Sequence, residues 1–280
     1  IGHISGVGAA ALTGVGLFTP ILMLINAFAM LAGSGGAPRA AISMGKKDNK
    51  TAEKILGNCF ALLILMAVIL TVVFFTFAPQ LLTLFGASEK TLPYGVAYAR
   101  IYILGSIFVL IVMGMNPFIT TQGFAKISMM TTVIGAVINI ILDPIFIFVF
   151  HLGVRGAALA TVLSQAVGAV WILRFLTGKK TILHLRKENF RLRRDIILPC
   201  LALGISTFVM LSTESILSIS FTSSLSRYGG DLAVGAMTII TSDTSTSDCL
   251  NLSDYFLQSS VQIICIHTLS HLPISYHQKY

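Results

Sequence analysis

Residues 139–148 read NIILDPIFIF. Asn139 and Asp143 stand four residues apart in an otherwise apolar run, and Pro144 follows the acid. Residues with this spacing share one face of a helix. Proline lacks a backbone N–H and disturbs the helix that contains it. The stretch therefore combines a carboxylate, an amide and an irregular backbone in an apolar setting.

That setting extends along the whole chain. Of 280 residues, 55% are hydrophobic and 11% are charged, and the mean hydropathy is +0.86. Soluble domains carry about 25% charged residues. Apolar runs of about 20 residues recur, a length that crosses a bilayer as a helix. The runs lack strand-like alternation, so we expect an all-α polytopic membrane protein.

Six spans are expected. They cover residues 10–34, 56–78, 95–116, 127–150, 154–177 and 196–222. A further apolar segment, DLAVGAMTII at 231–240, is expected to begin a seventh span. Thirteen of the 19 Lys and Arg residues fall in loops on one side, which predicts that these loops are cytoplasmic. The same bias accounts for most of the net charge of +8, so no nucleic-acid partner is expected.

The sequence near each end of the chain predicts a further feature. GAAALTGV (8–15) and GGDLAVGA (229–236) share glycine spacing, a weak repeat of the kind found in transporters, and this predicts one more helix before residue 8. After residue 240 the chain becomes rich in Ser and Thr and contains three aspartates. Each Asp at the centre of a membrane helix costs roughly 2.5–3.5 kcal/mol. Residues 243–280 are therefore expected to be a polar tail, or the product of a reading-frame error or truncation.

Two of the eleven acidic residues, Asp143 and Glu214, lie deep in apolar runs. Such carboxylates indicate a functional site, with simple interhelical hydrogen bonding as the alternative. The Asp143 carboxylate, the Asn139 amide oxygen and a carbonyl freed at Pro144 would form an oxygen-lined site for a hard cation or a proton. Thr161, on the next span, would complete it.

No metal or nucleophile motif occurs within the spans, so neither an enzyme nor a bound cofactor is expected. The four cysteines show no paired spacing, and a packing role is expected for the two in or beside spans, Cys59 and Cys200.

Longer stretches resemble a known family. NPFITTQGFAKISMM (116–130) and the segment 135–173, which includes the opening motif, closely resemble the multidrug and toxic compound extrusion (MATE) family. The similarity is to its bacterial MepA-like and DinF-like branch. Residues 14–48 and 212–240 are similar as well, so the resemblance covers about residues 1–242.

The resemblance implies a bundle of twelve helices in two six-helix lobes. Residues 1–177 would supply helices two to six of the N-lobe, 178–195 the basic loop between lobes, and 196–242 helix seven and the start of helix eight. Asn139, Asp143 and Thr161 match the family's N-lobe cation site, whose further first-helix aspartate has no counterpart here. Glu214 resembles an acid of the C-lobe.

The implied activity is export of cationic or amphipathic compounds in exchange for H⁺ or Na⁺. We expect a monomer in the plasma membrane. The walls of the substrate cavity are expected to include Met115, Phe118, Gln165 and Met210. The alternative is plain helix packing for Met115, Phe118 and Met210, and interhelical hydrogen bonding for Gln165. A lipid-linked oligosaccharide flippase, a membrane enzyme and an inert membrane fragment are the alternatives. The inert fragment is an alternative because half a transporter cannot alternate between inward-facing and outward-facing states.

Overall fold

The computed structural model describes residues 8–250, and every regular element among them is helical. The elements are α1 (Gly8–Gly16), α2 (Thr19–Gly45), α3 (Asn49–Leu84), α4 (Leu92–Thr121), α5 (Ala125–Pro144), the π-helical turn η1 (Ile145–Val149), α6 (Val154–Leu176), the 3₁₀ turn η2 (Lys187–Asn189) and α7 (Arg194–Leu250). The expected all-α class is confirmed.

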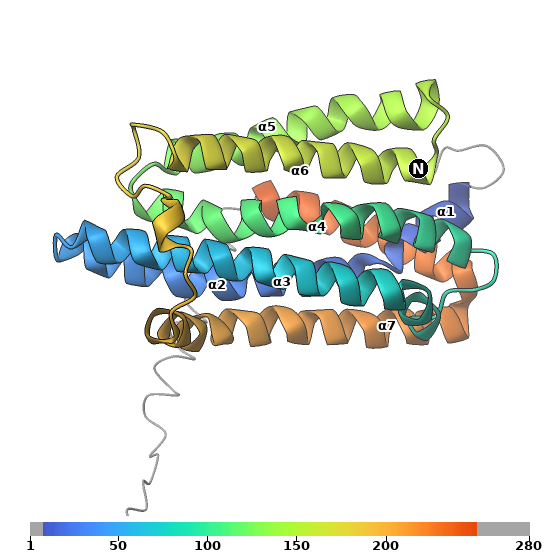
Figure 1. Ribbon diagram of the computed structural model, residues 1–280. Coiled ribbons are helices and arrows are strands. Elements are labelled where there is room, and N and C mark those ends of the chain that lie inside the picture. The colour runs from blue at the N-terminus through green and yellow to red at the C-terminus, as the bar shows by residue number, and fades with distance from the viewer. Residues whose placement is uncertain (1–7, 251–280) are drawn as a thin grey trace, which may run out of the picture. The chain divides into compact units, whose positions relative to one another are not determined.

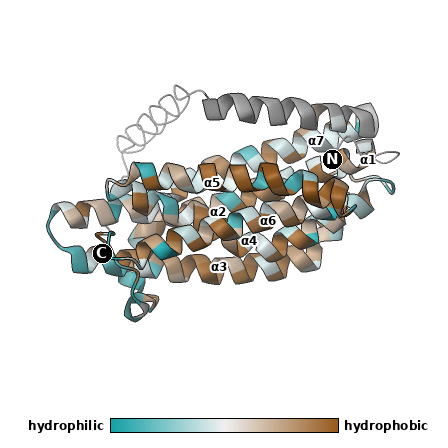
Figure 2. Cartoon of the chain, turned by 90° about the horizontal axis from the view of Figure 1, so that it is seen from above, coloured by the Kyte–Doolittle hydropathy of each residue, from teal (hydrophilic) through white to brown (hydrophobic). Residues whose placement is uncertain are grey.

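Six helical segments of this part of the chain are long and apolar enough to cross a membrane. They are Ala10–Gly45, Asn49–Leu84, Leu92–Thr121, Ala125–Val149, Val154–Leu176 and Arg194–Tyr228. Each corresponds to one of the six expected spans, although the expected spans 127–150 and 154–177 end one residue beyond their helical segments. In Figure 2 apolar residues cover the lengths of these helices, while hydrophilic residues gather where the helices are connected.

Local sequence signals set several of the helix ends. Asp48 caps α3, because its carboxylate accepts a hydrogen bond from the amide of Thr51 at 3.1 Å. Gly86 and Gly123 follow α3 and α4 with φ of +99° and +89°, a backbone conformation that only glycine adopts without strain. Pro20 stands at the start of α2, where its missing N–H removes no helical hydrogen bond.

Two expected boundaries are wrong. The first span was expected as one helix over 10–34, but α1 and α2 are separated at Leu17 and Phe18, where Pro20 prevents α-helical continuity, and α2 runs on to Gly45. A new span was expected at residue 231, whereas α7 is continuous from Arg194 to Leu250. Two adjacent glycines, Gly229 and Gly230, lower helix propensity but do not by themselves end a helix.

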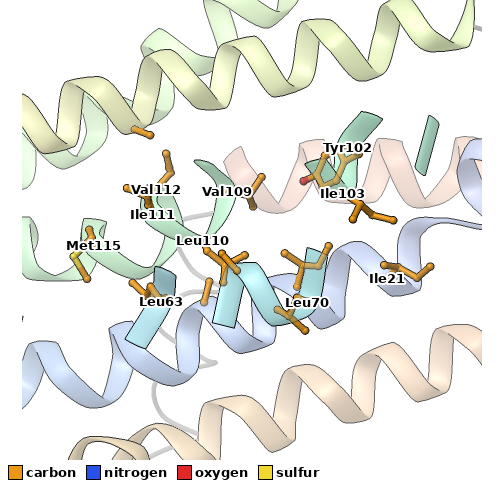
Figure 3. Packing of buried hydrophobic residues seen from close by; sticks show 14 of the residues in the cluster. Ile21, Leu63, Leu70, Tyr102, Ile103, Val109, Leu110, Ile111, Val112 and Met115 are labelled. Carbon is orange, nitrogen blue, oxygen red and sulfur yellow. The ribbon is translucent and has the colours of Figure 1, made fainter. Parts of the chain in front are cut away.

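α4 occupies the centre of the bundle. It packs against α1, α2, α3, α5 and α6, and in Figure 1 it lies between α6 and α3. Small residues allow close approach of the helices: a Cβ added to Gly33 of α2 would lie 2.8 Å from the carbonyl oxygen of Gly114 in α4. Figure 3 shows part of the buried hydrophobic cluster, including Leu63 and Leu110, both fully buried.

α7 packs along α2. The hydroxyl of Ser215 donates to the carbonyl of Pro20 at 2.8 Å, and the rings of Phe28 and Phe208 lie 4.9 Å apart. The first compact unit of the chain ends at Gly235, and a second begins at Ala236 within the same helix. The contacts described below all belong to the first unit.

The basic linker, residues 177–193, is bound to the helix ends beneath it. The buried side-chain oxygen of Gln122, at the end of α4, accepts hydrogen bonds from the Thr181 hydroxyl at 2.8 Å and from the amides of Ile182 and Leu183 at 3.0 Å each. Glu53 of α3 accepts from the amide of His184 at 3.2 Å. Its other carboxylate oxygen lies 3.3 Å from Nε of Arg186. The linker is therefore an ordered part of the bundle.

The end of the linker is held by a third side chain. Asn58 of α3 is buried; its Oδ1 accepts from the amide of Arg193 at 2.7 Å, and its Nδ2 donates to the carbonyl of Asn189 at 3.2 Å. One amide thereby fixes both the 3₁₀ turn and the residue immediately before α7.

Candidate functional site

The opening motif and the span after it meet between α5 and α6, which lie side by side in Figure 1. The Nδ2 of Asn139 donates to the hydroxyl oxygen of Thr161 at 3.4 Å. That hydroxyl donates in turn to the carbonyl of Ala157 on its own helix at 3.0 Å. With its nitrogen so oriented, Asn139 keeps its carbonyl oxygen available as an acceptor.

Asp143 lies one helical turn after Asn139 and is half-buried. Its Oδ1 is inaccessible to solvent and has no hydrogen-bond donor among the residues that the structure describes. A buried carboxylate oxygen without a donor is costly unless a proton or a cation binds it. The predicted group of Asp143, Asn139 and Thr161 therefore contains an acceptor for a positive charge.

Tyr98 of α4 is a further polar side chain at this place. It is 7% exposed, and its side chain lies close to those of Thr161 and Asp143. Sequence reasoning missed it, because an aromatic residue in an apolar run gives no local signal that it faces a cluster on other helices. Its ring stacks on that of Tyr102, one turn further along α4, with the ring centroids 6.0 Å apart.

The backbone irregularity expected at Pro144 is present. α5 ends there and continues as the π-helical turn η1, a geometry common where a helix cannot keep its regular hydrogen bonds. α6 passes close to this turn: a Cβ added to Gly156 would lie 2.7 Å from the carbonyl of Phe146. The glycine thus allows Thr161, further along α6, to approach α5.

The remaining predicted residues do not join this cluster. Glu214 is exposed on α7, and Met210 is half-buried on the same helix. Gln165 is half-buried one turn after Thr161. Met115 and Phe118 are fully buried, and Figure 3 places Met115 in the packed layer with Leu63 and Leu110. This burial is consistent with helix packing, the alternative for Met115 and Phe118, and their place in the wall of a substrate cavity stays a prediction.

The fold and the site define a multi-pass helical membrane protein with a cluster of oxygen-bearing side chains between two of its helices. Residues 1–145 match the MatE family model. The chain therefore belongs to the MATE family of efflux transporters, and the resemblance found in the sequence is confirmed.

Individual proteins similar to this chain are also named as multidrug export or multidrug resistance proteins. The chain is 28% identical over 218 residues to the "Multidrug export protein MepA" of Staphylococcus haemolyticus, covering 78% of this chain and 48% of that protein. It is 26% identical over 231 residues to the "Probable multidrug resistance protein YoeA" of Bacillus subtilis, covering 80% and 50%. The chain thus spans about half the length of the curated relatives it matches.

Solved structures share the fold. An inward-facing multidrug resistance MATE family transporter superposes with a TM-score of 0.80 at 29% identity, covering 84% of this chain and 54% of the other. The MATE multidrug transporter DinF-BH in complex with R6G superposes with a TM-score of 0.79 at 32% identity, covering 84% and 53%. The described helices therefore correspond to about half of a transporter of this family.

Proposed function

We propose that the intact protein to which these helices belong is a cation-coupled antiporter. It exports cationic or amphipathic drugs and takes H⁺ or Na⁺ inward by alternating access, in a plasma membrane with its basic loops in the cytoplasm. The relatives named as multidrug exporters support the substrate class. Because this chain covers about half of such proteins, we expect no complete transport cycle from the chain alone.

The observation that carries the proposal is the buried Oδ1 of Asp143. A carboxylate with oxygen ligands from Asn139, Thr161 and Tyr98 around it can bind either coupling ion. Bound charge removes the penalty of the unpaired oxygen, so the ion-bound and ion-free forms differ in stability. A neighbouring irregular turn, η1, gives α5 a place where its backbone hydrogen bonds can rearrange between these forms.

Ion and drug must then affect each other's binding reciprocally. If the ion changes drug affinity, the drug changes ion affinity by the same factor, typically 5- to 150-fold in allosteric proteins. The pump needs no direct contact between the two ligands, only two states of the bundle that they favour differently.

The test uses Asp143→Asn in the intact protein, reconstituted in vesicles. The substitution keeps the shape of the side chain and removes its charge, so we expect efflux of a cationic dye driven by a proton or sodium gradient to fall at least about tenfold. Imposing the two gradients separately identifies the coupling ion. Asp195→Asn is the matched control, because Asp195 is exposed and pairs only with Arg193 at 2.9 Å among the described residues. Full gradient-driven efflux by Asp143→Asn would exclude this mechanism.

A further inference from the structure

Two thiols that the transport proposal does not use meet inside the bundle. Cys59 of α3 and Cys200 of α7 are each 1% exposed. Both are free cysteines, and the two side chains lie close enough to influence each other electrostatically. They come from opposite sides of the basic linker, so no spacing rule could pair them in the sequence.

The same turn of α2 lies against both cysteines. A Cβ added to Gly36 would lie 2.5 Å from Sγ of Cys59, and a Cβ added to Gly35 would overlap the carbonyl oxygen of Cys200. Any larger side chain at these two positions would push α3 or α7 away. The adjacent glycines therefore allow the two thiols to approach each other beside α2.

A positive charge lies at the pair. Nη1 of Arg39 donates to the carbonyl of Ile196 at 3.2 Å and is 3.8 Å from Sγ of Cys200. No carboxylate among the described residues lies within salt-bridge distance of Arg39. A cationic side chain within a membrane helix usually has an anionic or carbonyl partner. A guanidinium next to a thiol is a recurrent feature of reactive cysteines, because it stabilises the thiolate.

We propose that Cys59 and Cys200 are a redox-sensitive pair that forms a reversible disulfide when the cell is exposed to peroxide. The thiolate of Cys200, beside Arg39, attacks one oxygen of hydrogen peroxide, which breaks the O–O bond and gives a sulfenic acid and, after protonation, one water. The Cys59 sulfur then attacks the sulfenic sulfur, the S–S bond forms, and the hydroxyl leaves as a second water. Two thiols are oxidised by two electrons and one peroxide is reduced.

The product would join α3 covalently to α7. These helices are otherwise connected through three helices and the linker, so the bond would fix the start of α7 to the bundle that precedes it. This inference rests on the packing of Cys59, Cys200 and Arg39, and not on the proposed transport activity. Thiol–disulfide exchange with cellular thiols would reverse the bond.

The experiment uses the 280-residue chain in detergent with Cys249→Ser and Cys265→Ser, which leaves Cys59 and Cys200 as its thiols. The protein is treated with hydrogen peroxide, unfolded, alkylated and digested without reductant. We expect a peptide pair linked through Cys59 and Cys200, an intact mass lower by about 2 Da, and recovery of both thiols after reduction. Two alkylated cysteines after treatment, or oxygen addition to either sulfur without a link, would overturn the proposal.

A matched control moves one thiol to another face of the same helix. In Cys200→Ser with Leu203→Cys the new thiol replaces a side chain that is 53% exposed, and no link to Cys59 should form. A link formed equally well by this variant would show random collision and would also overturn the proposal. Arg39→Met should slow the reaction of Cys200 about tenfold; an unchanged rate would remove Arg39 from the proposed site.

Discussion

Replacing Gln122 by Met tests how firmly the basic linker is bound. Methionine keeps the length of the side chain but removes an oxygen that accepts three hydrogen bonds, two of them from the amides of Ile182 and Leu183. Gln122 is 7% exposed and Leu183 is fully buried, so water cannot easily replace the lost acceptor. At about 1 kcal/mol for each lost bond, the local free energy of opening should fall by about 3 kcal/mol.

Hydrogen exchange of the 280-residue chain, followed by mass spectrometry, measures this directly. A loss of 3 kcal/mol corresponds to about 100-fold faster exchange of the peptide containing Ile182 and Leu183. Thr121→Val is the control, because among residues 8–250 the Thr121 hydroxyl bonds only the carbonyl of Phe118 on its own helix, at 3.1 Å. Exchange within about threefold of the wild-type rate in Gln122→Met would refute the assignment of this side chain as an anchor.

Three further predictions concern other contacts. Gly204→Val should lower the thermal unfolding temperature by several degrees, because even a Cβ would overlap the carbonyl of Leu31 on α2; an unchanged temperature would contradict the close crossing. Asn58→Ala should destabilise the start of α7 by about 1–3 kcal/mol in urea unfolding, since the amide of Arg193 loses its acceptor; a midpoint equal to wild type would count against it. The pKa of Asp48 is held below its usual value by hydrogen bonds from the side chain and backbone of its capping partner. The cap therefore stabilises the start of α3 fully at pH values above the ordinary carboxyl pKa, and this stabilisation is lost as the pH falls through the lowered pKa. Amide exchange at the start of α3, corrected for intrinsic rates, should become faster only at acid pH. An acceleration that begins near neutral pH would point to another group.

Much of the architecture could be predicted from the sequence because the helices of this protein are surrounded by lipid. A run long enough to cross a bilayer must satisfy its backbone internally, and a helix is the simplest solution. The six spans follow from this rule. The ends of the helices do not follow from this rule. One proline, Pro20, separates α1 from α2 where a single helix was expected, and the glycine pair at Gly229 does not end α7.

The candidate site could be predicted where its residues are neighbours on one helix or the next. Asn139 and Asp143 share a face by spacing, and Thr161 follows on α6, so their meeting required only that consecutive helices pack together. Tyr98 could not be found in this way, because only the packing of α4 brings it there. The same reason hid the anchors of the linker, which join residues far apart in the chain: Gln122 and Thr181 are 59 positions apart, and Asn58 and Arg193 are 135 apart.

The bond between Asn58 and the amide of Arg193 also makes α7 a lever. Its fulcrum, Arg193, lies immediately before the helix, and the 35 residues from Arg194 to Tyr228 extend about 50 Å from that point. A tilt of about 10° would hardly displace the fulcrum, yet it would carry the far end through about 9 Å, given the helical rise per residue. The hydroxyl of Ser226, which donates to the carbonyl of Gly86 at 2.7 Å near that far end, would be among the first contacts to break. Small rotations at one membrane face would thus appear as large openings at the other.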